Sequence, residues 1–89
     1  MSSSFEVRWH EKAVKDLKNL DKETIRRVID KVKNHLNKRP LKLSKPLKGR
    51  FKGLYRYRIG DYRVIFVLDY EKKELLVLAV NHRKNIYKG

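Results

Sequence analysis

Residues 53–70, GLYRYRIGDYRVIFVLDY, restrict the fold most, because they predict a tight β-hairpin. Two runs rich in aromatic and β-branched residues flank Gly60 and Asp61, a pair that suits a two-residue turn requiring positive φ. With that turn, Arg58 lies directly opposite Arg63. Like charges opposite each other destabilise a strand pair by up to about 1 kcal/mol. The positions of these arginines are therefore not explained by a contribution to folding stability.

The alternation of residues gives the predicted hairpin two different faces. One face carries Tyr55, Tyr57, Ile59, Tyr62, Val64, Phe66 and Leu68. The other carries Leu54, Arg56, Arg58, Arg63, Ile65, Val67 and Asp69. Because the first set is aromatic and aliphatic, we expect helices to cover it, and we expect the arginines on the face without helices.

The remaining elements follow from periodicity and capping signals. Residues 5–9 alternate and predict an edge strand, residues 11–20 predict a short amphipathic helix, and residues 74–81 predict the last strand. Asp21 is a good N-cap for a second helix, which should end before Pro40.

These elements predict an α+β fold with the order β-α-α-β-β-β. Two helices would pack on one face of a four-stranded, mainly antiparallel sheet, with residues 39–53 as a basic loop. At 89 residues without a repeat or an internal linker, residues 1–89 are expected to form a single domain.

The chain is strongly and unevenly basic. It has 24 Lys/Arg against 10 Asp/Glu, a net charge of +14, and residues 39–63 carry nine basic side chains with Asp61 as the single acidic one. A polyanion such as nucleic acid is the natural partner for this segment. An anionic membrane surface is the competing interpretation, but it usually requires a basic amphipathic helix, and this segment is loop and hairpin.

Several functional classes are not supported by the sequence. There is no cysteine for a disulfide, a thiolate metal site or a nucleophile. His10, His35 and His82 lack metal-ligand spacing, so we expect no metal and no cofactor. The apolar runs are too short to span a bilayer, and we expect a cytoplasmic protein that does not bind membranes.

The C-terminal tail adds a second polar group of residues. If the last strand pairs beside residues 62–69, the tail emerges near the hairpin turn and brings Arg83 and Tyr87 close to Arg58 and Arg63. A solvated arginine face that blunts edge pairing is the alternative. A face that only improves solubility gains from mixed signs, however, so an arginine cluster favours an anionic ligand.

The sequence resembles the RelE/ParE toxin superfamily along nearly its whole length. The resemblance lies in AVKDLKNL, LKG, LYRYRIGDYRVIF and HRKNIY, in this order. HRKNIY is closer to the RelE branch. The resemblance implies a RelE-like fold and an mRNA interferase that cuts the codon in the ribosomal A site by attack of a ribose 2′-OH on the adjacent phosphate.

The resemblance also implies roles for individual residues. The catalytic set would be Arg58, Arg63, Arg83, Tyr87 and His82, and the RNA-binding set would be Arg56, Lys48, Arg50, Lys52 and Lys84. Arg56, Arg58 and Arg63 would hold the phosphate and its developing charge. Arg83 would serve the leaving group, and Tyr87 would stack on a base.

The chain departs from the best-known RelE pattern, which has lysine at the positions of Arg56 and Arg58. Arginine stays protonated in proteins, so it cannot act as the base. His82, Tyr87 or a ribosomal RNA group would then accept the 2′-OH proton.

Two other functions fit the same sequence: a ParE-like toxin that poisons DNA gyrase, and a nucleic-acid-binding domain without catalysis. For each toxin we expect an acidic, partly disordered antitoxin, similar to RelB, that covers or distorts the arginine face. The RelE-like function adds the ribosome and mRNA as partners.

Overall fold

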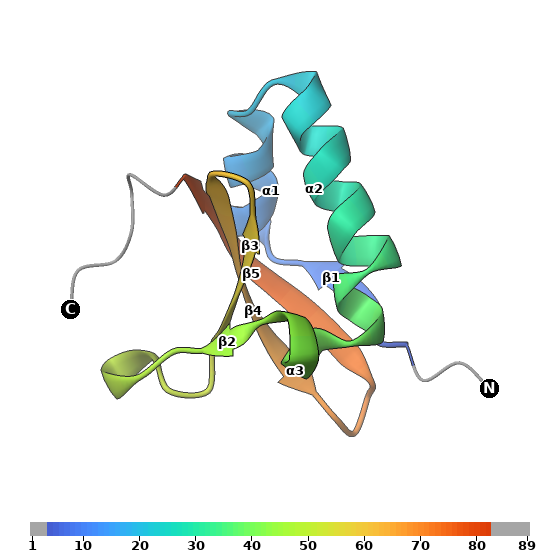
Figure 1. The fold of residues 1–89 in the computed structure, drawn as a ribbon, viewed down its shortest axis with the longest axis vertical. Helices are drawn as coiled ribbons and strands as arrows, with labels where there is room; N and C mark the ends of the chain where they lie inside the picture. Colours follow the sequence, from blue (N-terminus) through green and yellow to red (C-terminus); the bar gives the residue numbers. More distant parts are fainter. Residues whose placement is uncertain (1–3, 83–89) are drawn as a thin grey trace.

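The computed structural model describes residues 4–82, in which two main helices pack on one side of a five-stranded sheet (Figure 1). The elements in chain order are β1 (Glu6–Trp9), α1 (Glu11–Lys18), α2 (Lys22–Asn34), the 3-10 turn η1 (Leu36–Lys38), α3 (Pro40–Leu43), β2 (Lys45–Pro46), the 3-10 turn η2 (Gly49–Phe51), β3 (Tyr55–Ile59), β4 (Tyr62–Asp69) and β5 (Glu74–His82). The predicted α+β class is confirmed.

The strand order is β1-β5-β4-β3-β2, with β1 parallel to β5 and every other pair antiparallel. The prediction of four strands was wrong by one, because Lys45 pairs with Arg56 and Pro46 with Tyr55 to form β2. A two-residue strand is too short to show alternation in the sequence. Pro46 is tolerated because β2 lies at the sheet edge, where a missing N–H breaks no ladder.

Capping fixes where the two main helices begin. The side chain of Asp21 accepts a hydrogen bond from the backbone N–H of Thr24 (3.2 Å), as predicted for the N-cap of α2. The predicted first helix was two residues too long, since α1 ends at Lys18. Pro40 does not end α2; it occupies the first turn of α3, where its missing N–H costs nothing.

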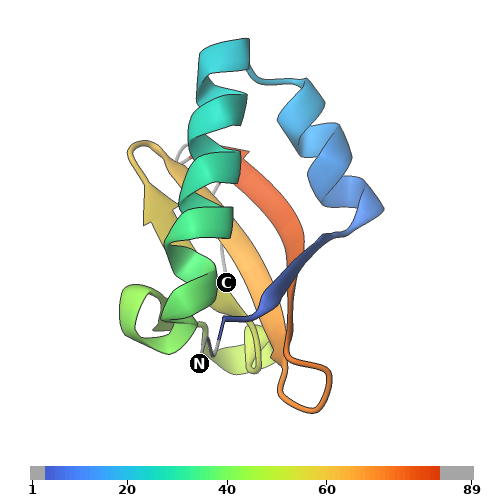
Figure 2. The same cartoon turned by 90° about the vertical axis from the view of Figure 1, so that its right-hand side faces the viewer.

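The core lies between α1, α2 and one face of the sheet (Figure 2). Its fully buried side chains include Val28, Val32 and Leu36 from the helical layer and Val64, Phe66, Leu75 and Val77 from the sheet. Of the predicted helix-side residues, Ile59, Val64 and Phe66 are buried, and Tyr55, Tyr57 and Leu68 are partly buried against this core. The assignment of faces on the hairpin is therefore confirmed.

A β-bulge interrupts the pairing of β4 with β5. Ile65 lies opposite Ala79, but the next residue, Phe66, lies opposite Val77, so β5 has one extra residue, Leu78. An extra residue reverses the alternation of every residue after it. This is why Val77 and Val80, an odd number of residues apart, both belong to the core.

Candidate anion-binding site

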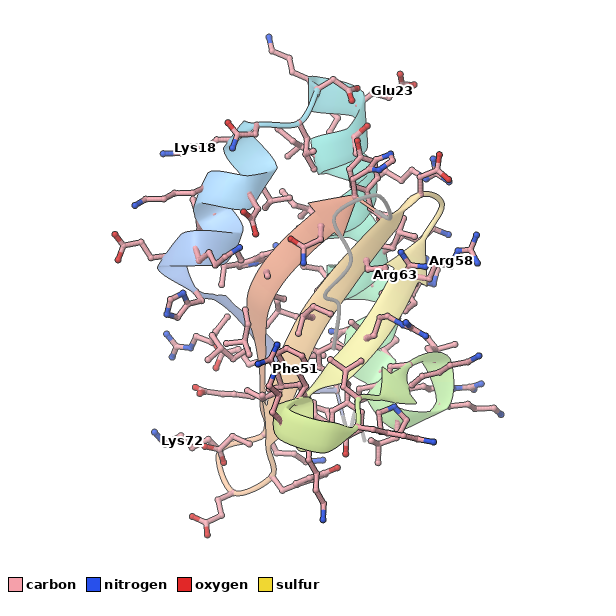
Figure 3. The ribbon with its side chains drawn as sticks, turned by 90° about the vertical axis from the view of Figure 1, so that its left-hand side faces the viewer. Lys18, Glu23, Phe51, Arg58, Arg63 and Lys72 are labelled. Atoms are coloured by element: carbon pink, nitrogen blue, oxygen red, sulfur yellow. The ribbon has the colours of Figure 1, made fainter. Side chains whose placement is uncertain are left out.

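The hairpin places three arginines on the face of the sheet that α1 and α2 do not cover. The register is the predicted one, with Arg58 opposite Arg63 and Arg56 opposite Ile65. Gly60 provides the positive φ of 57° that the turn requires. Figure 3 shows Arg58 and Arg63 on this open side, near the hairpin turn, with the helices behind the sheet.

A small hollow of about 140 Å³ lies among these side chains. Its lining residues come from α3, β2, β3 and β4, namely Leu43, Lys45, Arg56, Arg58 and Arg63. Four of the five are cationic and none is acidic. Guanidinium groups bind phosphate oxygens in a two-point geometry, so the hollow is chemically suited to one phosphate-sized anion.

The guanidinium of Arg63 is the group in the hollow that most clearly indicates an anionic ligand. Its Nη1 atom is buried and has no hydrogen-bond partner in the described part of the chain. A buried donor without a partner costs free energy, and more so when it is charged. Arg63 therefore has a buried donor that no acceptor among residues 4–82 satisfies.

The neighbouring arginines also lack carboxylate partners. The Nε atom of Arg58 donates to the carbonyl oxygen of Gly60 (3.1 Å), across the turn. Within residues 4–82, the two ion pairs lie elsewhere, between Arg8 and Glu74 and between Lys12 and Asp16. In this part of the chain, no carboxylate lines the hollow or forms an ion pair with its arginines.

The basic loop residues expected to bind RNA lie beside a second hollow, of about 450 Å³. Lys48 and Lys52 line it, and the guanidinium of Arg50 lies 5.3 Å from the centre of the Phe51 ring. The loop that carries η2 projects on the side of the sheet opposite to the helices (Figure 1). The structure therefore brings the loop to the same side as the arginines, but to a different hollow.

His82 does not join the arginines. It pairs with Tyr62, and their rings meet edge to face with centroids 5.1 Å apart. Tyr62 lies opposite Ile59, a core residue, so His82 belongs to the helix side of the sheet. The bulge at Leu78 causes this placement, because an uninterrupted β5 would put His82 on the arginine face. The role of His82 as the base stays a prediction.

Arg83, Lys84 and Tyr87, the tail residues of the predicted site, lie outside the described residues. Two residues of the hollow were missed from the sequence: Lys45, which the edge pairing brings to Arg56, and Leu43. The Lys-rich loop was a signal for Lys45. Nothing in the sequence indicated Leu43.

Two searches of the described residues have negative results. In residues 4–82 no group of three or more His, Cys, Asp or Glu side chains could hold a metal ion. No helix in that range is long and apolar enough to cross a membrane.

Comparison with known proteins assigns this chain to a family. Residues 7–87 match the family model described as the ParE toxin of the type II toxin–antitoxin system parDE. The chain belongs to the RelE/ParE family of type II toxins. The chain is 31% identical over 84 residues to toxin RelG of Mycobacterium tuberculosis, covering 94% of this chain and 97% of that protein. It is 29% identical to the putative toxin RelE1 of Methanocaldococcus jannaschii, with 96% and 97% covered.

Solved structures agree with this assignment. The RelBE2 toxin–antitoxin complex of M. tuberculosis has a chain that superposes with a TM-score of 0.86 at 30% identity, covering 90% of this chain and 99% of that one. The archaeal RelE–RelB complex of Pyrococcus horikoshii gives a TM-score of 0.70 at 29% identity, covering 93% and 99%. The isolated RelE toxin of E. coli, at 18% identity and a TM-score of 0.71, shares the fold.

Proposed function

We propose that this toxin is an mRNA endoribonuclease that acts on the ribosome and thereby inhibits translation. The observation that carries the proposal is the hollow lined by four cationic side chains, in which Nη1 of Arg63 has no partner among residues 4–82. A scissile phosphate supplies what that hollow lacks, which is a compact anion with several acceptor oxygens. The RelE and RelG names of its relatives support the same branch of the family.

In the proposed reaction, the ribose 2′-oxygen attacks the adjacent phosphorus and the bond from phosphorus to the 5′-oxygen breaks. The products are a 2′,3′-cyclic phosphate and a free 5′-hydroxyl. Arg56, Arg58 and Arg63 stabilise the charge that develops on the phosphate oxygens. Arg83 assists the departing 5′-oxygen, and Tyr87 stacks on a base.

One proton acceptor is needed for the 2′-OH, and the arginines cannot provide it. Tyr57 is no substitute, since it lies on the helix side and burial raises the pKa of its phenol, which keeps the group protonated at neutral pH. The acceptor is therefore Tyr87, a ribosomal RNA group, or His82 if the ribosome-bound state brings it to the substrate.

Primer extension on translated mRNA after induction of the toxin tests this proposal. We expect cuts in codon register for the wild type and a loss of about 100-fold in Arg63→Ala, as for removal of one transition-state donor. Arg26→Ala, an exposed arginine on α2, is the matched control and should cut normally. Intact mRNA with the wild-type toxin would refute the proposal.

A ParE-like function is the second candidate, and the family model itself favours it because that model describes the ParE toxin. Arginine at both positions where RelE has lysine is consistent with a face that binds without cutting. Accumulation of covalent gyrase–DNA complexes, with mRNA intact, would establish this alternative.

We also propose an acidic antitoxin as the partner of the arginine face. The RelBE2 and RelE–RelB neighbours are toxin–antitoxin complexes. Charge complementarity supports such a partner for a chain of net charge +14. Co-expression with the acidic product of an adjacent gene should abolish toxicity.

A further inference from the structure

The first helix contains an acidic residue, Asp16, that the proposed reaction does not use. Its Oδ2 atom accepts a hydrogen bond from the backbone N–H of Val80 in β5 (2.9 Å). The same oxygen lies 3.0 Å from the Nζ atom of Lys12, one helical turn earlier. The Asp16 side chain is 20% exposed, so this contact lies partly beneath the surface.

The position of this contact in the sheet explains why a side chain is needed there. Strand β1 pairs with β5 only from Glu74 to Val77. The backbone N–H of His10 then donates to the carbonyl oxygen of Val77 (2.8 Å), where the chain turns into α1. Beyond Val77 the outer edge of β5 has no neighbouring strand in the described sheet. Asp16 supplies to Val80 the acceptor that a continued β1 would have supplied.

Val80 also lies two residues after the extra residue Leu78, in the part of β5 whose register the bulge sets. With the extra residue Leu78, Asn81 lies opposite Arg63 on the basic face and Val80 enters the core. Without it, Val80 would lie opposite Arg63, and Asn81 would turn to the helix side. A slip of one residue therefore exchanges a polar side chain for an apolar one next to Arg63.

We propose that Asp16 is a positioning residue. By accepting the N–H of Val80, it holds the post-bulge register that presents Asn81 beside Arg63 on the basic face. The part of this inference that concerns RNA rests on the proposed function; the part that concerns register does not. It also accounts for the aspartate within the AVKDLKNL segment of α1.

Binding of a fluorescent oligoribonucleotide separates positioning from simple electrostatics. Removing a negative charge from a basic protein should tighten RNA binding. If Asp16 positions Asn81, Asp16→Ala should instead weaken binding on the order of tenfold, as for loss of a supporting contact. Asp30→Ala, which removes an exposed carboxylate on α2, is the charge-matched control and should bind as well as the wild type or better.

Two further variants identify which interaction of Asp16 matters. Asp16→Asn keeps a side-chain oxygen for Val80, and Lys12→Met removes the ion pair but leaves the contact with Val80. Asp16→Asn should bind RNA as tightly as the wild type or more tightly, and Lys12→Met should bind only slightly more weakly, as expected for one lost positive charge. A loss in Asp16→Asn equal to that in Asp16→Ala would overturn the proposal, as would tighter binding by Asp16→Ala.

Amide hydrogen exchange tests the register without RNA. In Asp16→Ala, the Val80 amide should exchange much faster, and cross-strand NOEs between Asn81 and Arg63 should be lost. If the exchange rate and the NOEs are both unchanged, the proposal is refuted. This result does not depend on whether the wild type binds RNA. If Asp16→Ala does not fold, hydrogen exchange in the wild type tests the proposal instead. A wild-type Val80 amide that exchanged as fast as an unprotected amide would refute the proposal.

Discussion

The two faces of the sheet use the same strands for opposite purposes. On the covered face, Val64 and Phe66 of β4 are fully buried against helices. On the open face, Arg63 of the same strand carries a buried nitrogen atom that has no hydrogen-bond partner within residues 4–82. Because side chains alternate, one side of β4 contributes to stability, and under the proposed function Arg63 on its other side contributes to binding. The comparison teaches that substitutions in adjacent positions should have separable effects on the two properties.

The largest effect is expected on the covered face. Phe66→Ala should lower the free energy of unfolding by about 3–5 kcal/mol, because it removes a fully buried ring and leaves a cavity. Urea unfolding measures this change. Val14→Ala, at an apolar position that is 37% exposed, should change stability by less than about 0.5 kcal/mol. Equal losses in the two variants would show that burial against the helices is not what makes Phe66 important for stability.

On the open face, Arg63→Ala should reduce oligoribonucleotide affinity about 10–100-fold, because it removes charged hydrogen bonds to phosphate. The slope of log affinity against log salt should fall by about 1. Fluorescence anisotropy at several salt concentrations measures both. Arg26→Ala on α2 serves as the control. If Arg63→Ala lost stability rather than affinity, the open face would be structural.

A smaller effect of opposite sign is expected at Arg58. Arg58→Thr should raise the free energy of unfolding by about 0.2–1 kcal/mol, because it removes the cross-strand repulsion with Arg63. The same variant should bind RNA more weakly. Arg58→Lys keeps the charge and should show no gain in stability. A destabilised Arg58→Thr would mean that the arginine pair does not oppose folding.

The smallest effect concerns the start of α2. The hydrogen bonds from the Thr24 side chain and backbone lower the pKa of Asp21 below its ordinary value of 3.8. A lowered pKa stabilises the fold above the unfolded pKa, and this stabilisation is lost as the pH falls through the folded pKa. The thermal midpoint of Asp21→Ala should thus approach that of the wild type as the pH falls below 3.8.

The control for this prediction is Asp21→Asn, which keeps an N-cap acceptor but does not titrate. Its midpoint should lie above that of Asp21→Ala at neutral pH. A gap between the wild type and Asp21→Ala that stayed constant down to low pH would show that the carboxylate charge is irrelevant to the cap.

The sequence predicted the hairpin well, because alternation and the Gly60-Asp61 pair act locally. The register of Arg58 with Arg63 and the separation of the two faces followed directly from that turn. The N-cap at Asp21 was equally predictable, because N-capping depends only on residues that are close in the sequence.

Two features could not be read from the sequence, for physical reasons. The bulge lies within LLVLAV, residues 75–80, where every residue is apolar and no alternation marks the face of each. The placement of His82 depends on that bulge. The pairing that brings Lys45 to Arg56 depends on tertiary contacts of a two-residue edge strand. Arg83 and Tyr87, which lie outside the described residues, stay predictions.

The choice of arginine at positions 56, 58 and 63 has a consequence for control of the protein. A guanidinium keeps its proton at every physiological pH, so a change of pH in the cell leaves the charge of this surface unaltered. Histidine at the same positions would gain or lose its charge near neutral pH. Because the charge is permanent, the proposed antitoxin has to inhibit this surface by occupying it, and under that proposal the ratio of antitoxin to toxin determines how much toxin is active.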